Sequence, residues 1–285
     1  MAGTTLTMKR FSPCSLLALA VLGVLCSCRS HPEYDHGHPA KSQDDRVHYL
    51  ILHYTVLDEA ASLKELSEGG VSAHYLVGLG HPPAIYQLVD ESRRAFHAGV
   101  SEWKGQNNLN YASIGIEVVN RGFTDTPQGR VWAPFPEEQI DALIPLIREI
   151  VARHQITPDR VLGHSDIAPQ RKQDPGPMFP WKRLAAAGLA LWPDEKAVAA
   201  CRPGFAVRLP DPAWFQRHLA LFGYKVPQHG QLDEETRTVV SAFQMRFRPA
   251  RIDGTPDAET AALLEVLTPT PPASPVPAAP VPAKK

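Results

Sequence analysis

The stretch "VHYLILHYT", residues 47–55, is an almost unbroken apolar run that carries His53 near its end. A continuous apolar run of this length lacks the alternation of a half-exposed strand and is typical of a strand buried on both faces. Such strands occur in sheets that helices cover on both sides. His53 would then stand at an edge of the sheet, where its ring is held rigidly.

Further segments of the sequence predict additional strands, with helices between them. Apolar runs predict strands at residues 74–79, 84–89, 113–120 and 160–164. Apolar residues recur at helical spacing over 136–156, which predicts an amphipathic helix with a kink at Pro145. We therefore expect an α/β domain over residues 47–192, with a mixed central β-sheet flanked by helices.

The C-terminal third shows a different pattern. Three helical segments are predicted at residues 211–224, 233–247 and 257–267. The phrases "GQLDEET" and "GTPDAET" precede the last two and offer Asp233 and Asp257 as N-caps. We expect a small three-helix domain over 207–267. A linker is expected at 193–206, and a disordered tail rich in Pro and Ala at 268–285.

The N-terminus has the features of a secretory signal. Lys9 and Arg10 precede an apolar run, and "LCSC" (25–28) resembles a bacterial lipobox. Residues 1–27 would be removed and Cys28 lipidated, followed by a polar tether over 28–46. Ser30 stands where an aspartate usually retains lipoproteins in the inner membrane, so we expect anchoring at the periplasmic side of the outer membrane. An ordinary signal peptide with incidental cysteines is the alternative.

Charge and cysteine content exclude some classes of protein. The chain has 29 basic and 30 acidic residues, and loss of Lys9 and Arg10 makes the balance more acidic, which argues against nucleic acid as a partner. Processing would leave Cys201 as the one free cysteine, so no intramolecular disulfide framework is expected. We expect a monomer.

The segment "GHSDIAPQRKQDPG", residues 163–176, is too broken to be a helix and concentrates polar side chains. Zinc takes imidazole nitrogen and carboxylate oxygen, and a hydrolytic site keeps one position open. Two strand ends and a loop braced by prolines could bring His53, His164 and Asp174 together around one Zn²⁺ per chain. Each histidine taken alone is more often a structural residue than a ligand.

Two further side chains suit hydrolysis at such a site. Glu117 lies inside the apolar run "IGIEVV", where a carboxylate is costly unless it has a task, and general base is the task expected. Lys172 lies two residues before Asp174, so in an extended segment both side chains point the same way, and its charge could stabilise an oxyanion. The alternatives are a solvent-facing Glu117 on an edge strand and a plain surface lysine.

Five blocks of the sequence carry a family resemblance. "ILHYT", "VSAHYLV", "RAFHAGVSEWKG", "SIGIEVVN" and "GHSDIAPQRKQDPG" resemble, in order, the blocks of the zinc N-acetylmuramoyl-L-alanine amidases of the AmpD/AmiD type, over roughly 47–181. The resemblance implies zinc on His53, His164 and Asp174, with Glu117 and Lys172 as catalytic residues. It also makes His97 and Trp103 candidate substrate contacts, whereas His74 is expected to be structural. Residues 207–267 resemble a three-helix peptidoglycan-binding domain.

The activity implied is hydrolysis of the amide between N-acetylmuramic acid and L-alanine, with peptidoglycan and muropeptides as partners. A recognition protein without activity on the same fold is one alternative. A non-haem iron oxygenase is another, because "HSD" (164–166) matches half of a facial triad, which would need His218 or His229 as the distal ligand.

Overall fold

The computed structural model describes residue 3 and residues 34–268. The chain divides into two compact units, residues 1–43 and 44–285, and residues 34–43 of the first contain no helix or strand. None of the helices within 34–268 combines the length and the apolar character needed to cross a bilayer. The expected signal peptide, Cys28 and residues 269–285 of the tail lie outside the described residues.

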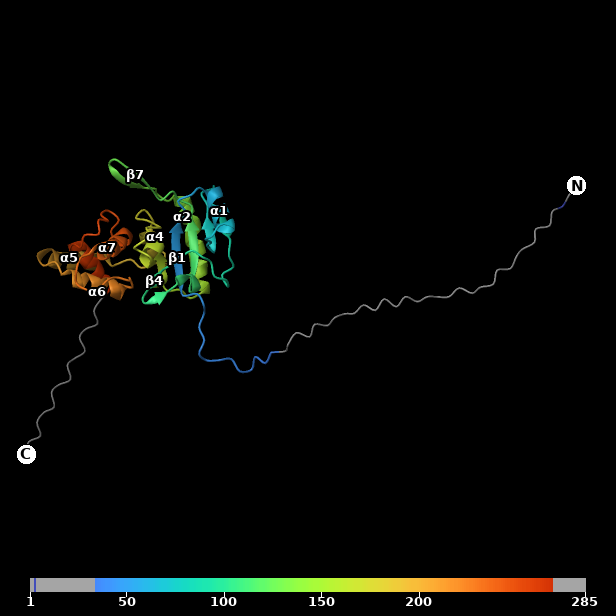
Figure 1. The fold of residues 1–285 in the computed structure, drawn as a ribbon, viewed down its shortest axis with the longest axis horizontal. Helices are drawn as coiled ribbons and strands as arrows, with labels where there is room; N and C mark the ends of the chain where they lie inside the picture. Colours follow the sequence, from blue (N-terminus) through green and yellow to red (C-terminus); the bar gives the residue numbers. More distant parts are fainter. Residues whose placement is uncertain (1–2, 4–33, 269–285) are drawn as a thin grey trace, which may run out of the picture. The chain divides into compact units, whose positions relative to one another are not determined.

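A five-stranded sheet forms the centre of the second unit (Figure 1). Its order is β3-β2-β6-β1-β9, parallel throughout except for β3, which pairs with β2 in the antiparallel direction. The strands are β1 (Tyr49–Tyr54), β2 (Tyr75–Val77), β3 (Ile85–Gln87), β6 (Ser113–Val118) and β9 (Val161–Gly163). Each falls inside a segment predicted as a strand, and the mixed sheet is confirmed.

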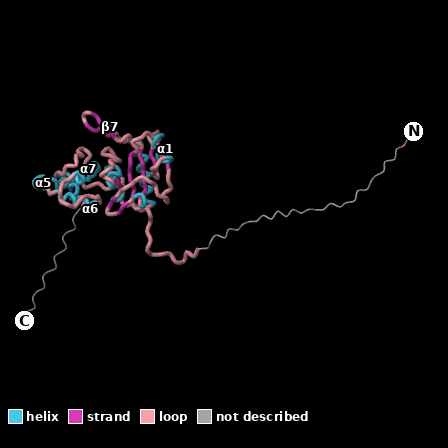
Figure 2. The backbone as a smooth tube through the Cα atoms, in the orientation of Figure 1, coloured by secondary structure: helices cyan, strands magenta, loops and turns pink. Residues whose placement is uncertain are grey.

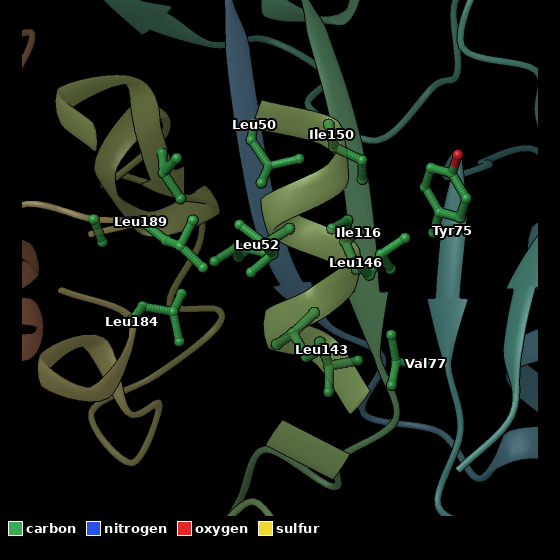
Figure 3. Packing of buried hydrophobic residues seen from close by; sticks show 14 of the residues in the cluster. Leu50, Leu52, Tyr75, Val77, Ile116, Leu143, Leu146, Ile150, Leu184 and Leu189 are labelled. Atoms are coloured by element: carbon green, nitrogen blue, oxygen red, sulfur yellow. The ribbon is translucent and has the colours of Figure 1, made fainter. Parts of the chain in front are cut away.

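Helix α2 (Glu137–Arg153) covers one face of this sheet. Its buried residues Leu143, Leu146 and Ile150 pack toward Leu52 and other apolar residues of β1, β2 and β6 (Figure 3). The helix lies within the segment predicted to be amphipathic, with Pro145 inside it. Alternate residues of each strand face this side, so the side chains of the odd-numbered residues of β1 and β6, including His53 and Glu117, face the other.

The opposite face of the sheet shares a continuous apolar cluster with the C-terminal helices. Tyr49 and Ile51 of β1 and Leu162 of β9 belong to the same cluster as Phe215 and Phe243. The helices are α6 (Pro212–Phe222), α7 (Glu234–Phe247) and α8 (Ala258–Leu267), as predicted. The predicted N-caps form as well: the Asp233 and Asp257 side chains accept hydrogen bonds from the backbone N–H of Thr236 and Thr260, each at 2.8 Å.

The segment expected to be a linker is mostly helical. Residues Glu195–Val207 form α5, which packs along α8, and Val198 and Phe205 lie against the shared apolar cluster. The Asp194 side chain caps its start, because it accepts hydrogen bonds from the backbone N–H of Lys196 and Ala197. An N-cap followed by alanine-rich helix formers outweighs the Pro and Gly near the end of the segment, and this corrects the linker expectation.

Several short elements are absent from the sequence prediction. These are α1 (Glu59–Glu68), β4 (Glu102–Trp103), β5 (Gln106–Asn107), β7 (Phe123–Thr126), β8 (Gly129–Trp132), α3 (His164–Ile167), α4 (Trp181–Ala186) and 3-10 turns at Leu109–Tyr111 and Pro158–Arg160. The β7–β8 hairpin extends away from the sheet (Figure 2). Helix α3 corrects the expectation for the 163–176 loop, because its first residues form one helical turn that starts at His164.

Candidate metal centre

Two neighbouring strands place His53 and His164 at the same edge of the sheet. Strands β1 and β9 are parallel and Leu52 pairs with Gly163, so the residue that follows each of them reaches the same level. Asp174 comes from the loop after α3, which is tied back to the helix because the Asp174 carbonyl accepts the Ser165 N–H at 2.8 Å. The three side chains are buried, with exposures of 1%, 3% and 7%.

The three side chains converge on one point through a single atom each. The Nδ1 atoms of His53 and His164 are 2.9 Å apart, and Asp174 Oδ2 lies 2.9 Å from the first and 3.0 Å from the second. Zinc bonds of ~2.0–2.1 Å in a tetrahedron would separate the ligand atoms by about 3.3 Å. The predicted ligands are therefore brought together in a triangle of nearly the size that a metal ion requires, and the described residues hold a candidate metal site.

Hydrogen bonds behind the triangle determine which nitrogen of His53 is free. Ser113 donates its hydroxyl to the Leu109 carbonyl, so its oxygen accepts from His97 Nε2 at 3.2 Å. This leaves His97 Nδ1 as an acceptor for the Nε2–H of His53, at 3.0 Å. The Nδ1 of His53 therefore faces the site as a bare lone pair.

His164 is oriented in the same way. Its Nε2 lies 3.1 Å from the Ala98 carbonyl oxygen, which can only accept, and 3.3 Å from Arg171 Nη2, which can only donate. The shorter contact favours the tautomer with the proton on Nε2, which leaves Nδ1 bare. Two bare nitrogens and a carboxylate oxygen within 3.0 Å repel one another unless a cation lies among them. This donor set fits a divalent metal ion, and the second hydrogen bond of each ring is the arrangement usual for metal-bound histidine.

The electrostatics of the site favour the forms that bind a metal. Burial and the neighbouring His164 lower the pKa of His53 to about 4, so its ring is neutral at neutral pH. Burial works against ionisation of Asp174, but the neighbouring His164 and His53 outweigh it and hold the pKa of Asp174 below its usual range. Neutral imidazoles and an ionised carboxylate are the forms that coordinate zinc.

Glu117 lies beside this triangle, as predicted. It pairs with His53 in the β1–β6 ladder, and its Oε1 is 4.0 Å from His53 Nδ1. Its Oε2 is buried and has no hydrogen-bond partner among the described residues. Burial, assisted by the charge of Asp174, raises the pKa of Glu117 to about 8, against the lowering effect of Lys172. A carboxylate without a partner, on a central strand, excludes the solvent-facing alternative.

A cavity of about 200 Å³ opens over these residues. Lys172 lines it together with Glu117, His164 and Asp174, so the predicted lysine and the predicted base border the same space. The rest of the lining mixes polar and apolar side chains, and four of the apolar ones are well exposed: Val56, Leu57, Val71 and Phe96. The cavity therefore combines a polar floor with an apolar rim that could hold a substrate.

Of the two predicted substrate contacts, His97 borders the cavity and Trp103 does not. The His97 ring lies directly on β6, where a Cβ on Gly115 would approach it to 2.4 Å, and it supports His53 from behind. Its main contact is thus with a ligand, although it also borders the cavity. Trp103 is 1% exposed and packs against Phe222 and Tyr224, so it is not available to substrate and that prediction is wrong.

His74 is structural, as expected, whereas the role of His97 and Ser113 in orienting His53 is a feature that the sequence did not predict. The Nδ1 of His74 accepts the Gly115 N–H at 2.9 Å, and its Nε2 donates to the Arg93 carbonyl at 3.1 Å. The orienting role of His97 and Ser113 was not predicted. A serine that opens an apolar strand, with a histidine sixteen residues before it, is the only sequence signal they leave.

The facial-triad interpretation of "HSD" fails on geometry. The carboxylate of Asp166 points away from His164 and accepts hydrogen bonds from Gly163 N, Tyr224 and Arg246. His218 is hydrogen-bonded to Thr268, and His229 contacts Asp233, so neither reaches the site. The iron oxygenase alternative is therefore wrong.

Comparison with known proteins supports the amidase interpretation. The sequence profile of the N-acetylmuramoyl-L-alanine amidase family matches residues 43–177, and that of a peptidoglycan binding domain matches residues 208–264. N-acetylmuramoyl-L-alanine amidase AmiD of Escherichia coli K12 is 44% identical over 241 residues, which cover 82% of this chain and 87% of the relative. The 1,6-anhydro-N-acetylmuramyl-L-alanine amidase AmpD of Enterobacter cloacae is 40% identical over 36% of this chain and 50% of its own.

Solved structures agree with these relatives. The Escherichia coli AmiD structure, a complex with anhydro-N-acetylmuramic acid-L-Ala-D-gamma-Glu-L-Lys, superimposes with a TM-score of 0.75 over 82% of this chain and 93% of the other. AmpDh3 of Pseudomonas aeruginosa, 41% identical, gives a TM-score of 0.77 over 83% and 97% of the two chains. The chain therefore belongs to the N-acetylmuramoyl-L-alanine amidases, with a peptidoglycan-binding domain after its catalytic domain.

Proposed function

We propose that this amidase binds one zinc ion through His53, His164 and Asp174 and uses it to cleave the bond between N-acetylmuramic acid and L-alanine. The observation that carries the proposal is the triangle of two bare Nδ1 atoms and one carboxylate oxygen, all within 3.0 Å. When bound, zinc polarises a carbonyl and lowers the pKa of water. All three ligand positions are present, which supports catalysis over a recognition protein without activity.

Glu117 is proposed as the general base. Its buried, unpartnered Oε2 can take a proton from the attacking water, and the raised pKa suits a group that must gain and lose a proton near neutral pH. Once protonated, Glu117 can pass that proton to the nitrogen of L-alanine as the amide bond breaks. The same carboxylate thus serves the addition and the departure of the amine.

Lys172 is proposed to stabilise the negative charge that develops on the carbonyl oxygen. Lys172 lines the cavity that Glu117 and Asp174 also line. A cation aimed at charge that appears only in the transition state raises turnover more than it raises substrate affinity. His97 and Ser113 act behind the ligands, because they hold His53 in the tautomer that leaves Nδ1 free.

The proposed substrates are peptidoglycan and the muropeptides released from it. Related enzymes were crystallised with an anhydro-N-acetylmuramic acid tripeptide and with an anhydromuramic pentapeptide, which supports anhydro-muropeptides as substrates here. The exposed apolar rim, Phe96 included, suits the methyl-bearing lactyl and alanyl groups on either side of the scissile bond. The C-terminal domain would hold the enzyme on the insoluble wall.

We further propose that Cys28 is lipidated and anchors a monomeric enzyme at the periplasmic side of the outer membrane. The lipobox-like "LCSC" and Ser30 support this proposal. Membrane fractionation of cells with the Cys28→Ala variant tests it, because the protein should leave the outer-membrane fraction. An unchanged distribution would contradict lipidation at Cys28.

The central experiment compares zinc content with product identity. The fragment 29–285 is incubated with purified sacculi and with a defined anhydro-muropeptide, and the products are identified by mass. We expect free stem peptides that begin with L-alanine, loss of turnover after zinc is removed by a chelator, and recovery with added zinc. Cleavage within the peptide or the glycan, or full turnover without metal, would contradict the proposal.

A further inference from the structure

Arg246 of α7 reaches out of the C-terminal domain into the catalytic domain. Its Nη1 donates to Asp166 Oδ2 at 2.5 Å, and its Nη2 donates to the Val161 carbonyl of β9 at 3.1 Å. The guanidinium also lies over the Trp181 ring, at 4.0 Å from its centroid. Arg246 and Asp166 are 3% and 1% exposed, so this ion pair is shielded from water.

A second residue of the C-terminal part contacts the same carboxylate. Tyr224, which follows α6, donates its hydroxyl to Asp166 Oδ1 at 2.5 Å and is 3% exposed. Both oxygens of Asp166 therefore receive a hydrogen bond from beyond the catalytic domain. The only other donor to this side chain among the described residues is the backbone N–H of Gly163, at 2.8 Å to Oδ2.

Asp166 connects these contacts to the metal site. Gly163 immediately precedes His164, and Asp166 holds that peptide at the start of α3, a helix of only four residues. The His164 ring leaves the same turn, and its Nδ1 is one corner of the ligand triangle. A shift of Asp166 would therefore move the backbone from which a ligand projects.

Loss of the outside partners would force such a shift. A buried carboxylate without its cation is strongly disfavoured, so Asp166 would turn toward water and release Gly163 N. The effect on metal binding would resemble the loss of an orienting partner behind a metal ligand, which typically costs 10–100-fold in affinity.

We propose that Arg246 and Tyr224 are positioning residues of the metal site, and that the C-terminal domain completes the catalytic centre through Asp166 as well as binding the wall. This inference rests on the proposed zinc site. It departs from the expectation that this domain serves only to concentrate the enzyme on the wall, because removal of the domain would also deprive Asp166 of two partners.

The chain contains a matched control for Arg246. Arg248 lies two residues further along, is 6% exposed and forms an ion pair with Asp257 at 2.6 Å. That pair lies wholly within the C-terminal domain. Arg246→Met breaks a buried ion pair and Arg248→Met a partly buried one, so both should lower the melting temperature. Only Arg246 contacts Asp166, the residue that connects to His164.

The experiment measures metal binding in the full chain. Zinc affinity is determined by competition with a chromophoric chelator, and the visible spectrum of the Co²⁺-substituted protein reports the ligand geometry. We expect Arg246→Met to weaken zinc binding roughly tenfold or more and to change the Co²⁺ spectrum. Arg248→Met should match the parent in both, and kcat should fall in the first variant alone.

Two further variants keep the inference testable if Arg246→Met folds poorly. Tyr224→Phe keeps the ring and removes one hydrogen bond, so a smaller loss of zinc affinity is expected. Adding Asp166→Asn to Arg246→Met removes the unpaired charge and keeps an oxygen for Gly163 N, so affinity should recover in part. Equal affinity and spectra in the parent, Arg246→Met and Tyr224→Phe would overturn the inference, whereas a parent without zinc would overturn the proposed function instead.

Discussion

Glu91 and Glu117 are buried to nearly the same extent in one domain but have opposite surroundings. Their side chains are 12% and 15% exposed. Glu91 accepts hydrogen bonds from Tyr75 at 2.7 Å, from Arg153 at 2.8 Å and from His154 at 2.7 Å. Glu117 lies within 4.0 Å of His53 and has one oxygen without any partner in the described structure.

The two pKa values diverge accordingly. Burial of Glu91 is outweighed by its hydrogen bonds, which lower its pKa to about 2, whereas burial of Glu117 raises its pKa to about 8. A satisfied carboxylate ties elements together, and here Glu91 joins β2 to the end of α2. A carboxylate left unsatisfied costs stability and is available for chemistry. Hydrogen-bond partners, and not the exposed fraction of the side chain, separate the structural Glu91 from Glu117, the proposed catalytic acid.

The largest loss of turnover is expected for a substitution of a proposed metal ligand. His53→Ala removes a ligand and the neighbour of Glu117, so zinc and turnover should both fall to background. Metal content by mass spectrometry and release of stem peptide are measured on the same sample. Retention of one zinc ion per chain with normal turnover would show that the triangle is not the metal site.

Glu117→Gln tests the catalytic half of the comparison. The amide cannot accept the proton from water, so turnover should drop by ~10²–10⁴-fold. The ligands are unchanged, so zinc content should remain at the parent value. Turnover within a few-fold of the parent would remove Glu117 from the mechanism, and loss of zinc would make it a structural support of the site instead.

The Lys172→Met variant tests whether the positive charge of Lys172 stabilises the transition state. Loss of one stabilising group for an oxyanion costs on the order of 10²-fold in kcat. KM for a soluble muropeptide should change much less, because the charge develops only during reaction. A rise in KM at constant kcat would reassign Lys172 to ground-state binding of the substrate.

Glu91→Gln tests the structural half and should leave turnover per folded molecule unchanged. Loss of charged hydrogen bonds should lower the free energy of unfolding by about 1–3 kcal/mol at pH 7. The pKa of Glu91 is depressed in the folded state, so its stabilisation is present above the unfolded value near 4.5 and disappears as pH falls toward 2. Denaturant unfolding of both proteins at pH 7 and pH 3 should show the difference shrinking, and a constant difference would contradict the assignment.

The convergence of His53, His164, Asp174 and Glu117 was predictable from the sequence because these residues lie in short segments with clear local patterns. His53 and Glu117 lie within apolar strands. A charged or imidazole side chain in such a strand is costly to bury, and it therefore indicates a functional site. Parallel pairing then brings the strand ends to one edge. The strands and α2 were predictable for the same reason, since periodicity is a property of a single segment.

Contacts between distant segments could not be predicted in this way. The Trp103 side chain was assigned to substrate from its neighbourhood in the sequence, but the position of Phe222 and Tyr224 against it depends on how the C-terminal helices pack. The pairing of Arg246 with Asp166 spans eighty residues and leaves no local pattern. Helix α5 was not predicted, although Asp194 caps its start and alanines follow.

The direct pairing of His53 with Glu117 in the β1–β6 ladder has a consequence for motion. Both strands are interior to the sheet, so their amide protons are held by hydrogen bonds that open only with the rarest and largest fluctuations of the domain. The spacing between His53, a proposed ligand, and Glu117, the proposed base, is therefore maintained as long as the sheet itself persists. Lys172 and Asp174 lie outside the strand ladder, on the loop after α3. We therefore expect amide hydrogen exchange to be slower in β1 and β6 than in that loop.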